Sequence, residues 1–107
     1  SPTSVLQTEG LQDIYTPPIA IETLAAAAGS PIIGNVHAQI TAMELYGNHG
    51  ASEGVGNLQA YDGEDYTAGL VQFPEQGHFA IFDSLRAAEL YREFLRSSIE
   101  DDLPYIE

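Results

Sequence analysis

The apolar residues of this chain fall into short runs separated by glycine, proline and polar residues, a pattern typical of alternating strands and helices. An apolar centre within residues 4–8 predicts a short strand, and the continuous apolar run at 69–73 predicts a buried one. Strand-like runs at 58–61 and 66–71 flank the turn sequence 62–65, which contains aspartate-glycine. We therefore expect the second strand to have an antiparallel partner before it.

Two helices are predicted. The first covers residues 17–28, with Thr16 as its N-cap and Gly29 just past its end. The second runs from about residue 84 to residue 98, capped by Asp83 or Ser84. Five apolar residues recur at helical spacing along one face of this second helix: Leu85, Ala88, Tyr91, Phe94 and Leu95.

The rest of the chain has weaker patterns. Residues 31–36 suit a strand or an extended loop, and 37–46 match helical spacing only in part. Because it is rich in glycine, we expect 47–57 to be a long loop, so that 36–57 is an irregular insertion. The acidic residues 99–107 are expected to form a loose tail.

These elements predict an α/β fold in one partial domain, 1–107, because 107 residues allow only one small domain. Two or three strands with two helices give few apolar faces to close against one another, so the chain resembles a piece of something larger. Its apolar fraction of 44% is ordinary for a folded protein.

Charge and composition exclude several classes of function. Sixteen acidic residues against three arginines give a formal charge of −13, which repels nucleic-acid backbones and anionic membrane surfaces. No apolar run approaches the roughly 20 residues of a membrane span. The absence of cysteine excludes disulfides and thiolate zinc sites.

Two polar residues follow the predicted strands. His78 comes after the strand at 69–73 and the turn Pro74–Gly77, and Asp13 comes after the strand at 4–8. Ligands of open α/β sheets bind at the carboxyl ends of the strands, so both residues are candidates for a site. A loop histidine without a role and a local turn or cap carboxylate remain the alternative interpretations.

The sequences around these two residues resemble the C-terminal part of serine α/β-hydrolases of the esterase and lipase type. Residues 5–18 resemble the segment that presents the acid of that family's triad, and Pro74–Phe79 resembles the loop that presents its histidine. The resemblance covers about residues 4–29 and 57–98, in the family's order of acid before histidine.

This resemblance implies the last strands and helices of a hydrolase sheet, with a hairpin before the last strand. It also implies that Asp13 is the acid and His78 the base of a serine triad. The implied reaction is hydrolysis of a carboxylic ester through an acyl-serine, without a cofactor or a metal. Phe79 and Phe82 are expected to pack beneath the site.

The nucleophile of such a triad should precede Asp13, and only twelve residues do. Gly50–Gly54 matches Gly-x-Ser-x-Gly by letter, but no apolar strand leads into Ser52 and no amphipathic helix leaves it. We therefore expect the serine in a missing N-terminal part of the hydrolase or on a partner chain. This chain alone should be inactive or nearly so.

Two other interpretations stay open. The first is a metal site, which the three histidines His37, His49 and His78 could form with carboxylates, although none of them has the usual spacing of metal ligands. The acidic residues 62–65 fit a solvated hairpin tip better than a calcium-binding loop. The second hypothesis for function is a non-catalytic, acidic α/β binding or assembly module with a hydrolase-like outline.

Overall fold

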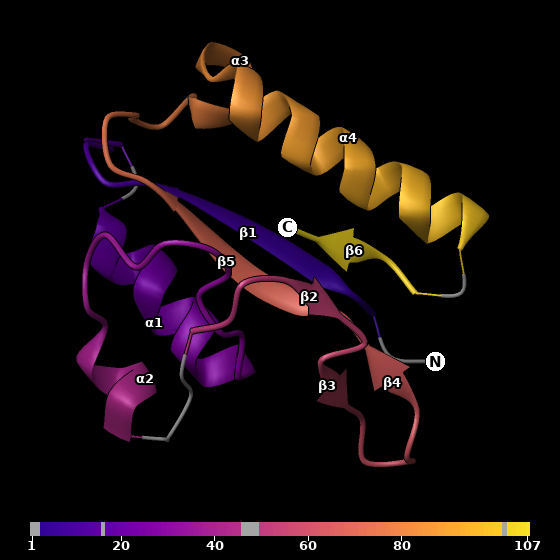
Figure 1. Ribbon diagram of the computed structural model, residues 1–107. Helices are drawn as coiled ribbons and strands as arrows, with labels where there is room; N and C mark the ends of the chain where they lie inside the picture. The colour runs from indigo at the N-terminus through magenta and orange to yellow at the C-terminus, as the bar shows by residue number, and fades with distance from the viewer. Residues whose placement is uncertain (1–2, 16, 46–49, 102) are drawn as a thin grey trace.

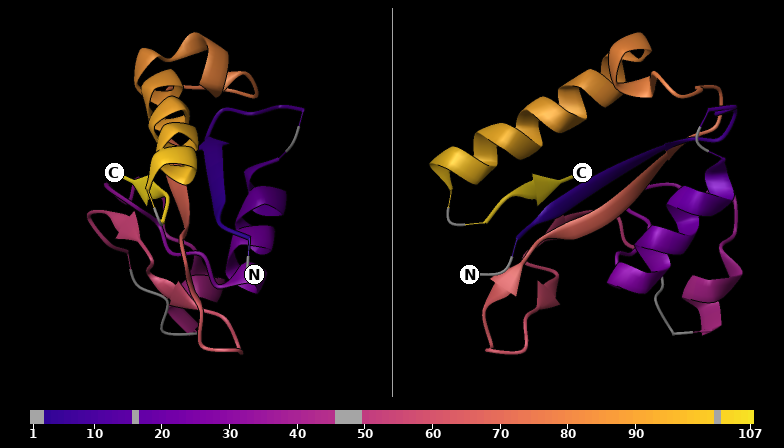
Figure 2. Two further views of the ribbon diagram at one scale, coloured as in Figure 1. Left: turned by 90° about the vertical axis from the view of Figure 1, so that its right-hand side faces the viewer. Right: turned by 180° about the vertical axis from the view of Figure 1, so that it is seen from behind.

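Two parallel strands, β1 (Val5–Gly10) and β5 (Ala68–Phe73), run side by side through the molecule, with helices on both faces (Figures 1 and 2). The computed structural model describes residues 3–15, 17–45, 50–101 and 103–107. The strands and helices form a small mixed α/β structure, as the sequence predicts.

The remaining elements are short, apart from the two longer helices. In chain order they are α1 (Pro18–Ala28), α2 (Thr41–Leu45), β2 (Gly54–Val55), β3 (Leu58–Gln59), β4 (Asp65–Tyr66), α3 (Ala80–Asp83), α4 (Leu85–Glu100) and β6 (Tyr105–Ile106).

The predicted antiparallel partner of β5 is wrong. A hairpin does precede β5, but it is made of β3 and β4, and the chain leaves it at Thr67 to join β1 in parallel. On its other edge β5 takes a parallel bridge from Ile32 to Leu70. All six residues of β5 are buried, which fits a central strand with a pairing partner along each edge.

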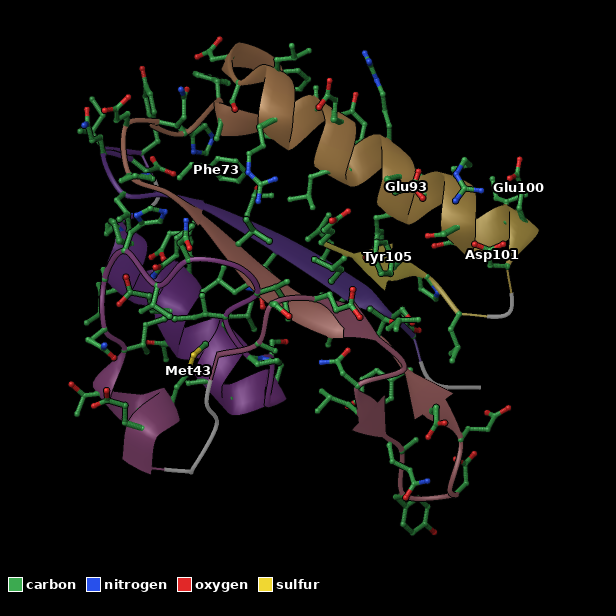
Figure 3. The ribbon with its side chains drawn as sticks, in the orientation of Figure 1. Met43, Phe73, Glu93, Glu100, Asp101 and Tyr105 are labelled. Carbon is green, nitrogen blue, oxygen red and sulfur yellow. The ribbon has the colours of Figure 1, made fainter. Side chains whose placement is uncertain are left out.

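The side chains of β5 alternate between two apolar cores. Val71 and Phe73 pack with Ala87 and Leu90 of α4, whereas Leu70 packs with residues of α1 and α2. Figure 3 shows Phe73 on the α4 side of the sheet and Met43 of α2 on the opposite side. The fold therefore has three layers, with α4 on one face and α1 and α2 on the other.

The helix ends match the sequence in part. Gly29 follows α1 with φ of 74°, the left-handed conformation expected there. The side chain of Ser84 accepts a hydrogen bond of 3.2 Å from the Ala87 N–H, which confirms it as the cap of α4. Pro17 is the N-cap residue of α1, and the predicted cap Thr16 lies outside the described residues.

The expectation of a loose tail at 99–107 is wrong. α4 continues to Glu100, and β6 pairs antiparallel with β2. Ile106 is fully buried in the core under α4, and the Thr67 hydroxyl donates to the carbonyl of Pro104. The many acidic residues of this segment suggested a solvated tail, but its buried residues are Pro104 and Ile106.

The insertion at 36–57 is also less irregular than expected. It contains α2 and β2, and Ala51 pairs with Ile33. The segment therefore continues the central sheet beyond Ile32 instead of looping away from it.

Surface charge is paired mainly at the end of α4. Arg96 forms hydrogen bonds with Glu93 and Glu100 and lies 3.7 Å from the carboxylate of Asp101. Figure 3 shows Glu100 and Asp101 at that end of the helix and Glu93 further back along it. The bond from Arg96 lowers the pKa of Glu93 below its usual range.

Replacing Ile106 by alanine should destabilise the protein by about 2–5 kcal/mol, because a fully buried side chain leaves a cavity between α4 and the sheet. The measurement is chemical denaturation, with Ile99→Ala as a control, since Ile99 is 85% exposed. If Ile106→Ala does not fold, Ile106→Val should cost about 0.5–1.5 kcal/mol. Equal effects at the two isoleucines would contradict the burial of β6.

A buried carboxyl lies on the α1 side of the sheet. Glu9 of β1 is fully buried, and its Oε1 accepts a hydrogen bond of 2.9 Å from Gln72 Nε2. Burial and the neighbouring Glu22 raise the pKa of Glu9 from 4.5 to about 8. The folded protein therefore holds Glu9 in its protonated form at neutral pH.

We expect stability to fall as pH rises from about 4.5 to about 8, because over this range the unfolded state releases the Glu9 proton while the folded state still holds it. Glu9→Gln should flatten this dependence, because the amide oxygen still accepts from Gln72 and no charge forms. Urea midpoints across this pH range are the measurement, and Glu75→Gln, at an exposed position, is the control. An unchanged slope in Glu9→Gln would contradict the assignment.

Candidate active site

The parallel register of β1 and β5 brings the loops that follow them to the same edge of the sheet. Gly10 lies opposite Phe73, the last residue of β5. The pairing continues into the loops, where Leu11 N–H donates to the Phe73 carbonyl over 3.1 Å and Gln12 N–H to the Gln76 carbonyl over 3.0 Å. The loops that carry Asp13 and His78 therefore start side by side.

Gly10 permits the close approach of these loops. A Cβ atom added to Gly10 would lie 2.1 Å from the carbonyl oxygen of Gly77 and 2.7 Å from that of Gln76. Only a residue without a side chain fits there while the second loop keeps its path. Gly10 thus sets the position of His78 beside the end of β1.

The structure brings Asp13 and His78 together. The His78 Nδ1 atom lies 3.1 Å from Asp13 Oδ2, and the Asp13 side chain is 4% exposed against 39% for the histidine. The other carboxylate oxygen, Oδ1, accepts a hydrogen bond of 2.8 Å from the Tyr15 N–H. Asp13 is therefore both a local turn carboxylate, as one interpretation held, and the partner of His78.

This arrangement suits an imidazole that accepts and releases a proton at Nε2. A carboxylate on Nδ1 fixes the ring tautomer and stabilises the imidazolium once it forms. Within the described ranges, Nε2 has no hydrogen bond from the protein. The ring is exposed enough for a reacting group to reach this atom.

The surroundings of His78 differ from the expectation in one respect. Phe79 and Phe82 do not pack beneath the site, because they are 51% and 74% exposed. The buried position next to them belongs to Ala80. Both phenylalanines therefore lie on the surface, whereas Ala80 enters the core.

Tyr15 is a neighbour of His78 that the sequence analysis did not identify. Its ring lies 5.2 Å from the imidazole and 6.0 Å from the ring of Phe79. Because aspartate commonly accepts a hydrogen bond from the N–H two residues on, the sequence could place the Tyr15 backbone beside the Asp13 carboxylate, but not its ring beside His78.

The other candidate residues do not join this site. Ser52 is exposed and lines an open hollow with Gly34 and Arg86, and neither Asp13 nor His78 is among the residues lining it. Strand β2 follows it, where a nucleophile would need a helix.

A metal centre finds no support in the part of the chain that is described. No group of three or more histidine, aspartate or glutamate side chains comes together there. His37 is exposed and uses its backbone N–H to bind Gln72, and His49 lies outside the described residues. The hairpin tip 62–65 is exposed, with the Glu64 N–H bound to Asp62.

Comparisons with known proteins identify no relative. No protein-family model, curated protein or solved structure matches the chain.

None of the described helices has the length and apolar character needed to cross a bilayer.

Gly10→Ala should separate the two loops and break the contact of Asp13 with His78, because the new methyl group overlaps the Gly77 carbonyl. Gly77→Ala is a matched control from the other side of the same approach, since its Cβ would meet the Gln12 carbonyl at 3.5 Å, an ordinary contact. Thermal denaturation and the imidazole signals of His78 in NMR spectra are the measurements. A normal His78 signal in Gly10→Ala would show that this approach does not position the histidine.

Proposed function

We propose that this chain is the C-terminal portion of a serine ester hydrolase, supplying the acid and the histidine of a triad whose serine lies outside it. The observation that carries the proposal is the 3.1 Å contact between His78 Nδ1 and the buried carboxylate of Asp13. It joins residues 65 positions apart, each placed just after one of two parallel strands.

The proposed chemistry follows from the free ring nitrogen. His78 Nε2 takes the proton of the serine hydroxyl as its oxygen attacks the ester carbonyl, and it returns that proton to the departing alcohol. Water then repeats the two steps on the acyl-serine, releasing the acid and restoring the serine. Asp13 stays ionised and stabilises the imidazolium in both halves of the reaction. No cofactor or metal is required.

The open edge of β1 supports the idea of a missing part. Val5 and Leu11 direct their N–H groups toward β5, so the backbone groups of Leu6 and Thr8 face the opposite edge. No described strand pairs there. We propose that the serine-bearing part adds a strand at this edge.

An apolar hollow adjoins the same edge. It measures about 320 Å³ and is lined by Leu6, Thr8, Tyr91, Phe94 and Leu95. A strand added to β1 would place its alternate side chains over this hollow, covering apolar surface that α4 leaves exposed. Leu6 and Phe94 are partly buried and also pack against the apolar core beneath α4.

The alternative is a non-catalytic binding or assembly module. The unpaired edge of β1 favours it too, because such an edge binds strands from any suitable partner. The two hypotheses differ in whether His78 Nε2 acts as a general base toward a serine. The decisive experiment must therefore measure reaction at a serine.

A fluorophosphonate probe, which modifies activated serines, tests the proposal on the complete natural protein that contains these residues. We expect labelling at a serine outside residues 1–107, together with hydrolysis of short p-nitrophenyl esters. His78→Ala should reduce both by roughly three orders of magnitude or more, because the serine loses its base.

His37→Ala is the matched control, since this exposed histidine binds the sheet only through its backbone and should leave the rates unchanged. Normal turnover in His78→Ala, or labelling at Ser52, would overturn the proposal. Absence of any labelling in a folded complete protein would favour the binding module.

A further inference from the structure

Three aromatic rings meet at the candidate site. The imidazole of His78 lies 5.2 Å from the ring of Tyr15 and 5.0 Å from the ring of Phe79, and the latter two rings lie 6.0 Å apart. The planes of His78 and Phe79 are nearly perpendicular, at 87°, which is a favourable edge-to-face arrangement. The two phenyl groups come from the different loops that follow β1 and β5.

Such support matters because His78 is otherwise weakly held. Its side chain is 39% exposed, it stands in a loop, and Asp13 provides its one hydrogen bond among the described residues. One bond at Nδ1 leaves the ring free to swing about that contact. A general base must hold Nε2 near the reacting oxygen, and a misplacement of about 1 Å can cost about a hundredfold in rate.

We propose that Tyr15 and Phe79 are positioning residues, which hold the His78 imidazole against Asp13 with Nε2 directed to the reacting group. This inference rests on the proposed function. It assigns to these residues a role beyond burial, because Tyr15 is 70% exposed and Phe79 51% exposed. Core packing therefore does not account for their contacts with the histidine.

Tyr15 also offers a clean separation of two effects. Its backbone N–H holds Asp13 Oδ1 at 2.8 Å, whereas its ring touches His78. Tyr15→Ala removes the ring and keeps the N–H, so the carboxylate stays in place. Any change at His78 in this variant then reports on the ring contact alone.

The first experiment uses the chain itself and needs no serine. Nitrogen-15 chemical shifts of the imidazole report its tautomer, and its line widths report exchange between ring orientations. In the unsubstituted chain we expect one dominant Nδ1–H form. In Tyr15→Ala and Phe79→Ala, the population of this form relative to the others should fall roughly 2- to 12-fold, the factor expected for loss of one aromatic contact.

Three further variants make the result decisive. Tyr15→Phe keeps the ring and should behave as the unsubstituted chain does. Tyr61→Ala removes a tyrosine that is fully exposed at the hairpin tip and should change nothing at His78. Asp13→Asn should abolish the dominant form altogether.

The outcomes separate this inference from the proposed function. If Asp13→Asn leaves the imidazole signals unchanged, the pair and the proposed function both fail. If Asp13→Asn alters them and neither Tyr15→Ala nor Phe79→Ala does, the positioning role is overturned and the pair stands.

In the complete enzyme, Tyr15→Ala should lower kcat by a similar factor with KM little changed, and Tyr15→Phe should restore it. A rise in KM at constant kcat would show instead that Tyr15 binds substrate.

Discussion

The parallel contact between β1 and β5 is the interaction on which the rest of this structure depends. It runs through six residue pairs and continues beyond both strands, where backbone bonds join Leu11 to Phe73 and Gln12 to Gln76. Antiparallel strands would send their following loops to opposite edges of the sheet. Because these two run in the same direction, an aspartate and a histidine far apart in sequence share one edge.

The layers around this pair of strands combine apolar packing with one polar network. Gln72, buried in β5, accepts from the N–H groups of His37 and Ala38 and donates to Glu9 and to the Ala38 carbonyl. An amide has both donors and acceptors, so it satisfies a loop and a protonated carboxyl together. The start of the insertion is thereby fixed to the sheet on the side of α1.

Local patterns in the sequence identify several elements correctly. The apolar run before Pro74, the glycine after the alanine-rich helix and the serine cap of α4 all appear as expected, because each depends on neighbouring residues. Pairing partners could not be read in this way. The aspartate-glycine turn suggested an antiparallel neighbour for β5, but the hairpin that contains this turn ends at Tyr66, before β5 begins. Strand β5, which is buried, pairs in parallel with β1 instead.

Among the site residues, Asp13 and His78 could be predicted because each follows a strand and each matches a family pattern. Tyr15 could not be placed from its sequence, because its contacts with His78 and Phe79 exist only once the two loops meet. Exposure of Phe79 and Phe82 was equally hidden. It depends on α3 being a single short turn that directs Ala80 inward.

The position of β6 has a consequence for how the molecule is made. Strand β2 ends at Val55 and can pair only after Tyr105 and Ile106 have been synthesised. In the same way, β1 can pair only after β5 has been synthesised. Contacts between residues so distant in sequence form late and slow folding. During synthesis, the surface under α4 stays uncovered until the segment after that helix has emerged, and the half-made chain exposes strands to neighbouring molecules.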